Sequence, residues 1–294
     1  MRTSHELLTM NSLPSLVVIA GPTASGKSDF AVGYALTHNG EIISADSRQV
    51  YKGLDIGTGK IRKDEMKGVK HYMLDVYDIG EEVSVARFAR DAAPIIQDIL
   101  SRGKTPIICG GTGQYIDALI YTTSIPEVKP NKQLRDELEK KSTEELFEIL
   151  QKKDRERAET IDSHNRVRLI RALEIIESLG KVPTHNTPVL LYPTTMYLLS
   201  PTRTILKERI TTRLEKRLRE GMIDEVRSVM KKGYTSNDMK KFGLEYVTIG
   251  KYLEGILTDE EMKKELITKS MQYAKRQETW NKKYQSFAIK IAVM

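Results

Sequence analysis

Residues 21–28 read Gly-Pro-Thr-Ala-Ser-Gly-Lys-Ser and match the phosphate-binding pattern G-x-x-x-x-G-K-[ST] in full. The glycines let the backbone curl so that successive N–H groups face phosphate oxygens. Lys27 supplies a positive charge, the Ser28 hydroxyl suits Mg²⁺, and the positive end of a following helix adds to the field. We expect a phosphorylated ligand at the following residues: Gly21, Pro22, Thr23, Ala24, Ser25, Gly26, Lys27 and Ser28.

A carboxylate that could do chemistry follows the short apolar stretch 41–44, at Asp46. Ligands bind at the carboxyl ends of the strands in open parallel sheets. A carboxylate placed there accepts a proton from a nucleophile or helps to hold a metal ion. The spacing equally allows Asp46 to cap the turn before Ser47, so both interpretations stay open at this point.

The strand expected at 105–109 ends in Gly110-Gly111-Thr112-Gly113 and carries no carboxylate. Phosphate-loop NTPases use an acid on a second strand to hold Mg²⁺. The missing acid argues against ordinary ATP hydrolysis. The glycine-rich run is, on its residues alone, also compatible with a tight turn that has no catalytic role.

The elements that must position these groups alternate between strand and helix. Apolar runs predict strands at Leu16–Ala20, 41–44, 105–109 and 195–199, and helical spacing predicts helices at 28–37 and 88–100. This order predicts an α/β fold, a P-loop NTPase-like parallel sheet with helices on both faces. Residues 121–192 are nearly all helical in pattern, so we expect an all-α insertion domain that divides a core made of 1–120 and 193–294.

Composition bounds the environment of the chain. The 294 residues include 39% apolar and 30% charged residues, which is typical of a globular protein, and a single cysteine, Cys109, excludes an internal disulfide. No apolar stretch approaches the ~18 residues of a membrane span. Residues 1–15 lack a signal-peptide core and are interpreted as a short frayed leader. We therefore expect a cytoplasmic protein without a membrane partner.

The net charge of +7 is unevenly distributed. Residues 1–202 carry 26 Lys and Arg against 27 Asp and Glu, whereas residues 203–294 carry 21 against 13. A concentrated positive field suits a polyanion such as nucleic acid. A solvated set of Lys-rich helices would give the same count, so charge alone leaves both interpretations open.

Six sequence motifs together identify a family. They are GPTASGKS, SADSRQVYKGLDIGTGK, KHYMLDV, GGTGQYIDAL, NRVRLIRALE and AKRQETW. In this order, from Gly21 to Trp280, they resemble the bacterial tRNA dimethylallyltransferases, also called tRNA isopentenyltransferases. The resemblance implies transfer of a dimethylallyl group from dimethylallyl diphosphate to N6 of the adenosine 3′-adjacent to the tRNA anticodon. It also implies Mg²⁺ as cofactor, tRNA as partner and a monomeric enzyme.

The resemblance assigns roles residue by residue. The phosphate loop would hold the leaving diphosphate with Arg213, Ser28 would bind Mg²⁺ through the diphosphate, and Asp46 would be the general base. Thr23 and Thr112 would lie beside the reacting groups. The residues implied to bind tRNA are Asp46, Ser47, Arg48, Gln49, Val167, Arg168, Leu169, Ile170, Arg171, Lys275, Arg276 and Gln277. Arg209 and Arg217 share a helix face with Arg213. The three arginines could form a functional cluster, or Arg209 and Arg217 could belong to a solvated stripe of basic residues, and both interpretations stay open.

Some positions depart from the family pattern or from a binding role. Gln114, Lys70 and Leu244 stand where the family commonly has Leu, His and Tyr. Trp280 could stack on a base, but we interpret it as a core residue. The zinc finger of eukaryotic relatives is excluded by the single cysteine, and the histidine spacing predicts no structural metal.

Three other functions stay open on the residues. A small-molecule P-loop kinase and a free-adenylate isopentenyltransferase both fit the phosphate loop, but neither needs a basic tail or an insertion. An RNA-binding NTPase module fits the charge, but the missing second-strand acid and the missing N-K-x-D motif speak against it.

Overall fold

The computed structural model describes residues 15–122, 126–183 and 188–293. The expected leader therefore lies almost wholly outside the described residues. The chain forms two compact units, one from Met1–Ile120 with Leu190–Met294 and the other from Tyr121–Val189. Among the residues described, no helix is both long enough and apolar enough to cross a membrane.

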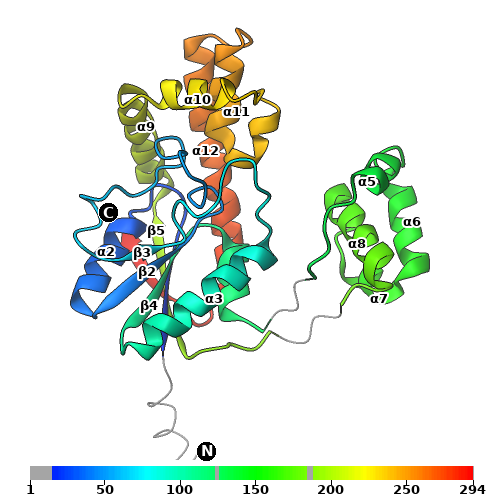
Figure 1. Ribbon diagram of the computed structural model, residues 1–294, viewed down its shortest axis with the longest axis horizontal. Coiled ribbons are helices and arrows are strands. Elements are labelled where there is room, and N and C mark those ends of the chain that lie inside the picture. The colour runs from blue at the N-terminus through cyan, green and yellow to red at the C-terminus, as the bar shows by residue number, and fades with distance from the viewer. Residues whose placement is uncertain (1–14, 123–125, 184–187, 294) are drawn as a thin grey trace, which may run out of the picture. The chain divides into compact units, whose positions relative to one another are not determined.

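A six-stranded sheet forms the centre of the larger unit, in the order β3-β2-β4-β1-β5-β6 (Figure 1). The strands are β1 (Leu16–Ala20), β2 (Gly40–Ala45), β3 (His71–Tyr72), β4 (Thr105–Gly110), β5 (Thr194–Pro201) and β6 (Ile289–Val293). Every pairing is parallel. The unbroken apolar sequence of β1 is buried at each position, as expected for an inner parallel strand. The predicted fold class is confirmed, whereas β3 and β6 were not predicted.

Helices cover the two faces of this sheet. The larger unit contains α2 (Lys27–Thr37), α3 (Val85–Ser101), α4 (Gly113–Ile120), α9 (Arg203–Arg219), α10 (Met222–Met230), α11 (Leu244–Leu253) and α12 (Asp259–Asn281), with short 3-10 helices at Asp238–Phe242 and Lys282–Tyr284. On one face α2 packs on Val17, Ile19 and Ile107. The alternate residues of the strands face the other side, where α3 and α4 contact β4. There Phe88 stacks on Tyr115, joining α3 to α4.

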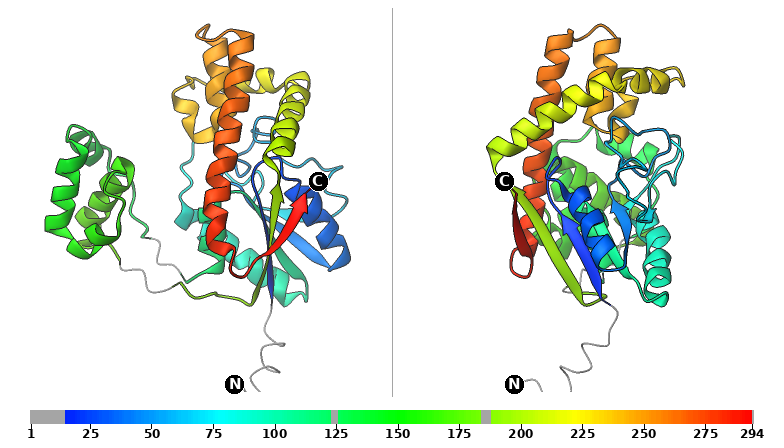
Figure 2. Two further views of the ribbon diagram at one scale, coloured as in Figure 1. Left: turned by 180° about the vertical axis from the view of Figure 1, so that it is seen from behind. Right: turned by 90° about the vertical axis from the view of Figure 1, so that its left-hand side faces the viewer.

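The register of the strands brings the sequence motifs to one edge. Ala20 of β1 and Ala45 of β2 both pair with Gly110 of β4. The segments that follow these three residues therefore begin side by side. The helices α9 and α11 stand beyond this carboxyl edge, and α12 runs from them back beside the sheet (Figure 2).

The smaller unit is built from α5 (Lys132–Leu138), α6 (Thr143–Lys153), α7 (Arg155–Thr160) and α8 (Arg166–Leu179). Its own apolar core includes Leu146, Leu150 and Leu169. A capping box of Ser142 and Glu145 begins α6. The buried carboxylate of Glu174 on α8 binds Arg135 of α5, with 2.7 Å between Nε and Oε1. This unit therefore has both an apolar core and an ion pair, between a buried carboxylate and a partly exposed arginine, that joins two of its helices.

Candidate active site at the carboxyl edge of the sheet

The phosphate loop connects β1 to α2 and has the curled backbone that its sequence predicts. Ala24 and Gly26 adopt left-handed conformations, with φ of 60° and 85°. Gly26 caps α2, so the positive end of an 11-residue helix lies at the loop. The Lys27 ammonium lies 3.4 Å from the carbonyl oxygen of Pro22, and burial lowers the pKa of Lys27. The loop is therefore a concentrated positive site suited to an anion.

Three arginines at successive turns of α9 reach the loops around this site. The guanidinium of Arg209 lies 3.5 Å from the carbonyl oxygen of Ser25, and that of Arg213 donates to the hydroxyl of Thr23. Arg217 reaches the carbonyl oxygen of Gly57 at 3.5 Å. Burial, together with the neighbouring Arg217, lowers the pKa of Arg213 to about 9. The contact of Arg217 with Gly57 argues against a fully solvated stripe, and a cluster of positive charge at this position favours an anionic ligand.

Asp46 follows the last residue of β2 and combines the two interpretations that its sequence left open. Its Oδ1 accepts a hydrogen bond of 2.9 Å from the backbone N–H of Arg48, which caps the turn. The same carboxylate also faces the cavity that contains Lys27. A second oxygen is thus available for chemistry while the first fixes the side chain.

Two adjoining cavities lie over the carboxyl edge of the sheet. Thr23, Lys27 and Asp46 line both of them. The first is also lined by Ser28, Ser44, Gln49, Thr58, Cys109 and Arg213. The second, of about 390 Å³, is also lined by Arg48, Arg217, Glu245, Tyr273, Arg276 and Gln277. Two ligands that occupied these cavities would meet between the phosphate loop and Asp46.

Thr112 supports the turn beside Asp46. Its hydroxyl oxygen accepts a 3.0 Å hydrogen bond from the backbone N–H of Ser47 and donates to the Ser47 hydroxyl at 3.3 Å. Thr112 thereby fixes the backbone next to the candidate base. The glycine-rich run is a tight turn, as the sequence allowed, and it also places a hydroxyl beside the site.

The glycines around Thr112 permit the close approach of α12. A Cβ at Gly111 would lie 2.1 Å from Nε2 of Gln277, and one at Gly113 would lie 2.0 Å from the ring of Trp280. Trp280 also donates from its indole N–H to the hydroxyl of Tyr284. These contacts agree with the packing role predicted for Trp280.

Gln277 is buried, and both ends of its amide are bound within the protein. Its Oε1 accepts from the backbone N–H of Thr23 at 2.7 Å, and its Nε2 donates to the carbonyl oxygen of Gly111 at 3.0 Å. Gln277 therefore braces the phosphate loop and also lines the larger cavity, and its role in binding tRNA stays a prediction. Its neighbours Lys275 and Arg276 are exposed, and Arg276 lines the larger cavity.

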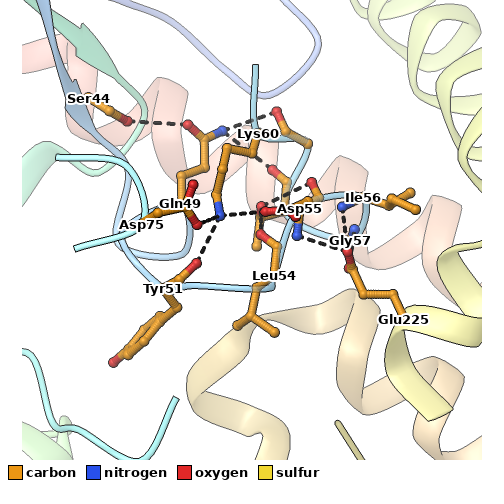
Figure 3. A network of polar contacts seen from close by, with 12 residues as sticks. Ser44, Gln49, Tyr51, Leu54, Asp55, Ile56, Gly57, Lys60, Asp75 and Glu225 are labelled. Atoms are coloured by element: carbon orange, nitrogen blue, oxygen red, sulfur yellow. Dashed lines mark hydrogen bonds and ion pairs between the residues drawn. The ribbon is translucent and has the colours of Figure 1, made fainter. Parts of the chain in front are cut away.

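Gln49 lines the first cavity but is similarly occupied. Its Oε1 accepts from the Ser44 hydroxyl, and its Nε2 lies 3.4 and 3.2 Å from the carbonyl oxygens of Thr58 and Gly59 (Figure 3). This amide therefore holds the loop that follows β2, and the reading of an adenine edge by Gln49 stays a prediction.

The predicted tRNA segment at 167–171 belongs to α8 of the smaller unit and divides in two. Val167 and Arg168 are exposed, whereas Leu169 and Ile170 lie in the core of the unit. Arg171 donates to the carbonyl oxygen of Val128 at 2.8 Å and pairs with Glu174. We therefore restrict the expected RNA contact to Val167 and Arg168 and assign packing to the others.

The cavity offers few side-chain donors for a metal ion. Among residues 15–122, 126–183 and 188–293, no group of three or more His, Cys, Asp and Glu side chains could hold a metal. The Ser28 hydroxyl lines the first cavity together with Asp46. This set fits Mg²⁺ bound mainly by phosphate oxygens and water, which is how Mg²⁺ commonly binds at phosphate sites.

Two groups of the site carried no prediction from the sequence. Glu245 on α11 lines the larger cavity, and burial raises its pKa against the opposing effect of Arg217. Glu225 on α10 binds the backbone of residues 55–57 from outside both cavities. The motif around residue 55 gave a signal for that loop, but nothing near Glu225 in the sequence points to its partners.

Comparisons with known proteins place the chain within one family. The family model described as IPP transferase matches residues 49–284. A tRNA dimethylallyltransferase of Caldicellulosiruptor saccharolyticus is 42% identical over 93% of this chain and 90% of its own length. The tRNA dimethylallyltransferase 2 of Treponema denticola is 39% identical over 97% of each chain.

Solved structures show the same similarity. The tRNA isopentenylpyrophosphate transferase of Bacillus halodurans has a TM-score of 0.70 at 37% identity, over 95% of this chain and 89% of that one. A eukaryotic dimethylallyltransferase, described in crystallographic snapshots as acting on tRNA, has a TM-score of 0.82 at 27% identity, over 95% of this chain and 74% of that one. The resemblance drawn from the motifs is confirmed.

Proposed function

The chain belongs to the IPP transferase family, and from that premise we propose that it transfers a dimethylallyl group from dimethylallyl diphosphate to tRNA. The acceptor atom is N6 of the adenosine 3′-adjacent to the anticodon. The observation that carries this proposal is that Thr23, Lys27 and Asp46 line both cavities. An anion site and a proton acceptor therefore face one space, where a donor and an acceptor can meet.

The diphosphate of the donor binds at the phosphate loop. Lys27, Ser28 and Arg213 line the first cavity, and residues 24–26 of the loop line an adjoining hollow with them, so these groups lie close to the negative charge that develops as the carbon–oxygen bond breaks. Thr23, fixed by Arg213, offers its hydroxyl toward the same oxygens. Because the protein holds these groups in place before the reaction, they stabilise the departing diphosphate without reorganising.

Mg²⁺ fits this site through the Ser28 hydroxyl and the diphosphate oxygens. When bound, the ion supplies further positive charge to the leaving group. The loop residues orient the diphosphate from one side. The positively charged guanidinium groups of Arg213 and Arg217 face the diphosphate from the other side. These protein groups define the position of the donor.

Asp46 acts as the general base. As N6 attacks the first carbon of the dimethylallyl group, the carbon–oxygen bond breaks and its electron pair leaves with the diphosphate. The N6 proton passes to the Asp46 carboxylate, whose other interaction, with the Arg48 N–H, holds it in position. A positioned base contributes roughly 10²- to 10⁴-fold to the rate of such a step.

The RNA contacts come from both units. Arg48 and Arg276 line the larger cavity, Lys275 is exposed beside them on α12, and Val167 and Arg168 are exposed on α8. A base that reacts at N6 must leave its stack to reach Asp46. Phosphate contacts from the basic side chains supply affinity that falls as salt concentration rises.

We further propose that the enzyme works as a monomer in the cytoplasm. One chain supplies every residue assigned above, and its single cysteine, Cys109, is buried as a free thiol, which suits a reducing compartment.

The test supplies unmodified tRNA with labelled dimethylallyl diphosphate and, in parallel, with ATP labelled at its terminal phosphate. Label that enters tRNA only from the isoprenoid donor supports the proposal. Turnover of ATP would favour a kinase or an NTPase, and transfer of the isoprenoid label to free AMP would favour a free-adenylate isopentenyltransferase.

A further inference from the structure

The loop of residues 54–60 contributes to the walls of both cavities. Thr58 lines both of them, Gly59 lines the first and Gly57 lines the second. Gln49 binds the carbonyl oxygens of Thr58 and Gly59 from one side, and Arg217 reaches the carbonyl oxygen of Gly57 from another. A shift of this loop would therefore move two walls of the site and the guanidinium beside Arg213.

One carboxylate outside the cavities holds this loop by its backbone. Glu225 accepts hydrogen bonds from the consecutive N–H groups of Asp55, Ile56 and Gly57, at 2.9, 2.8 and 2.9 Å (Figure 3). Its Oε1 also accepts from the Tyr246 hydroxyl at 2.6 Å. Charge-assisted hydrogen bonds of this kind are stronger than neutral ones, and four of them converge on a single side chain.

The opposite end of the loop is held by a buried lysine. Lys60 donates to the carbonyl oxygen of Tyr51 at 2.9 Å and pairs with Asp55 at 2.6 Å and with Asp75. Figure 3 shows Gln49 and Lys60 on one side of the loop and Glu225 on the other. Gly57 contacts the ring of Tyr246 so closely that a Cβ at this position would lie 2.8 Å from the ring. The loop is thus held in one position by α10, by α11 and by the residues that follow β2.

We propose that Glu225 is a positioning residue for the part of the site that binds the diphosphate of the donor. It acts through the loop, since it lines neither cavity, and it keeps Thr58 and Arg217 in the geometry that the diphosphate requires. This inference rests on the proposed function for its kinetic readout. The attachment of the loop to Glu225 can be measured without any substrate.

The test compares Glu225→Gln with the wild-type enzyme. Gln keeps the size of the side chain but has one acceptor oxygen, and its NH₂ group would face at least one of the three backbone N–H groups. We expect kcat/KM for dimethylallyl diphosphate to fall roughly 10- to 100-fold, as for a small misplacement of a reacting group. The dissociation constant for tRNA should change much less than kcat/KM, because phosphate contacts outside this loop supply most of the affinity. In the folded Glu225→Gln variant, the backbone amides of residues 54–60 should exchange hydrogen faster than in the wild type, as measured on the proteolytic peptide that covers this loop.

Two further variants separate positioning from general stability. Tyr246→Phe keeps the ring under Gly57 and removes one of the four donors, so it should lower kcat/KM in the same direction but less. Glu254→Gln is the matched control, because Glu254 also binds a backbone N–H, that of Ser236 at 2.8 Å, in a loop that lines neither cavity. Its kcat/KM should equal that of the wild type.

The outcomes distinguish a positioning role of Glu225 from a general contribution to stability. Unchanged exchange at residues 54–60 in Glu225→Gln, unchanged kcat/KM for the donor, or an equal loss in Glu254→Gln would overturn the positioning role. Weaker tRNA binding of the same size as the kinetic loss would also overturn it, because the effect would not be confined to the donor. A wild-type protein inactive with donor and tRNA would instead reject the proposed function, while the exchange experiment still tests the attachment.

Discussion

The backbone N–H of Thr23 donates a 2.7 Å hydrogen bond to Oε1 of Gln277, a residue 254 positions later in the chain. The amide of Gln277 also donates to Gly111, so one buried side chain joins the phosphate loop, the turn after β4 and α12. Lys275 and Arg276 lie on the same helix and are exposed. The helix expected to face RNA therefore supports the loop expected to hold the diphosphate.

Replacing Gln277 with Ala tests this brace. The change leaves the Thr23 N–H and the Gly111 carbonyl without their partner, at a cost of about 1–3 kcal/mol in the free energy of unfolding. We also expect KM for the isoprenoid donor to rise. Denaturant unfolding and steady-state kinetics measure the two effects. Gln114→Ala, at an exposed position of α4, is the control; equal stability and equal KM in both variants would contradict the brace.

Asp46 is tested with two substitutions, because it both caps a turn and faces the cavity. Asp46→Asn keeps an oxygen for the Arg48 N–H and loses the base, so kcat should fall roughly 10²- to 10⁴-fold with tRNA affinity retained. Asp46→Ala loses the cap as well and should also be less stable. Single-turnover kinetics and thermal melting separate the two roles. If Asp46→Asn kept the wild-type kcat, Asp46 would not be the base.

Arg168 tests the contribution of the smaller unit. We expect Arg168→Ala to raise KM for tRNA and to reduce the slope of log affinity against log salt by about 1, as for one lost phosphate contact. Filter binding over a range of salt concentrations measures the slope. Arg155→Ala is the control, since Arg155 is an exposed arginine of the same unit that lies outside the predicted tRNA-binding segment. Identical slopes in the two variants would leave Arg168 without a specific role.

Glu41 gives a prediction for stability against pH. Its buried carboxylate binds Arg102, Lys104 and Tyr72, and the hydrogen bonds from Arg102 are the main reason that its pKa lies well below the ordinary value of 4.5. The ionised group therefore stabilises the fold above pH 4.5, and this stabilisation is lost as the pH falls through the lowered pKa.

Arg102→Leu should consequently destabilise the protein by about 1–3 kcal/mol at pH 7, and the difference from the wild type should narrow as the pH falls below 4.5. Denaturant unfolding at several pH values measures this. Arg155→Leu breaks an exposed pair with Glu159 and should cost less than about 1 kcal/mol at any pH. A constant difference for Arg102→Leu across the pH range would contradict the assignment.

The elements predicted well are those determined by local sequence. The run Leu16–Ala20 is a strand because it is buried on both faces, and the helix predicted at 28–37 is Lys27–Thr37. β3 was missed because it has only two residues. β6 was missed although its sequence, Ile-Lys-Ile-Ala-Val, is mostly apolar, because its partner strand, β5, lies far away in the chain.

The candidate site was predictable where a short motif carries the chemistry. Three residues of the loop, Thr23, Lys27 and Ser28, line the first cavity together with Asp46 and Arg213. The bracing contacts of Gln277 and of Glu225 were not predicted, because their partners lie far away in the chain. A motif reports that a residue belongs to a segment, but burial decides whether its side chain meets a ligand or the protein.

The middle strand β1 pairs with β4 on one side and with β5 on the other. β5 begins only at Thr194, after the whole of the smaller unit has been synthesised. During translation the nascent chain therefore exposes one flank of its central strand while the four-helix unit, which has its own core, emerges from the ribosome and is free to fold. Completion of the sheet, and with it the catalytic pocket, is a late event in the biogenesis of this protein.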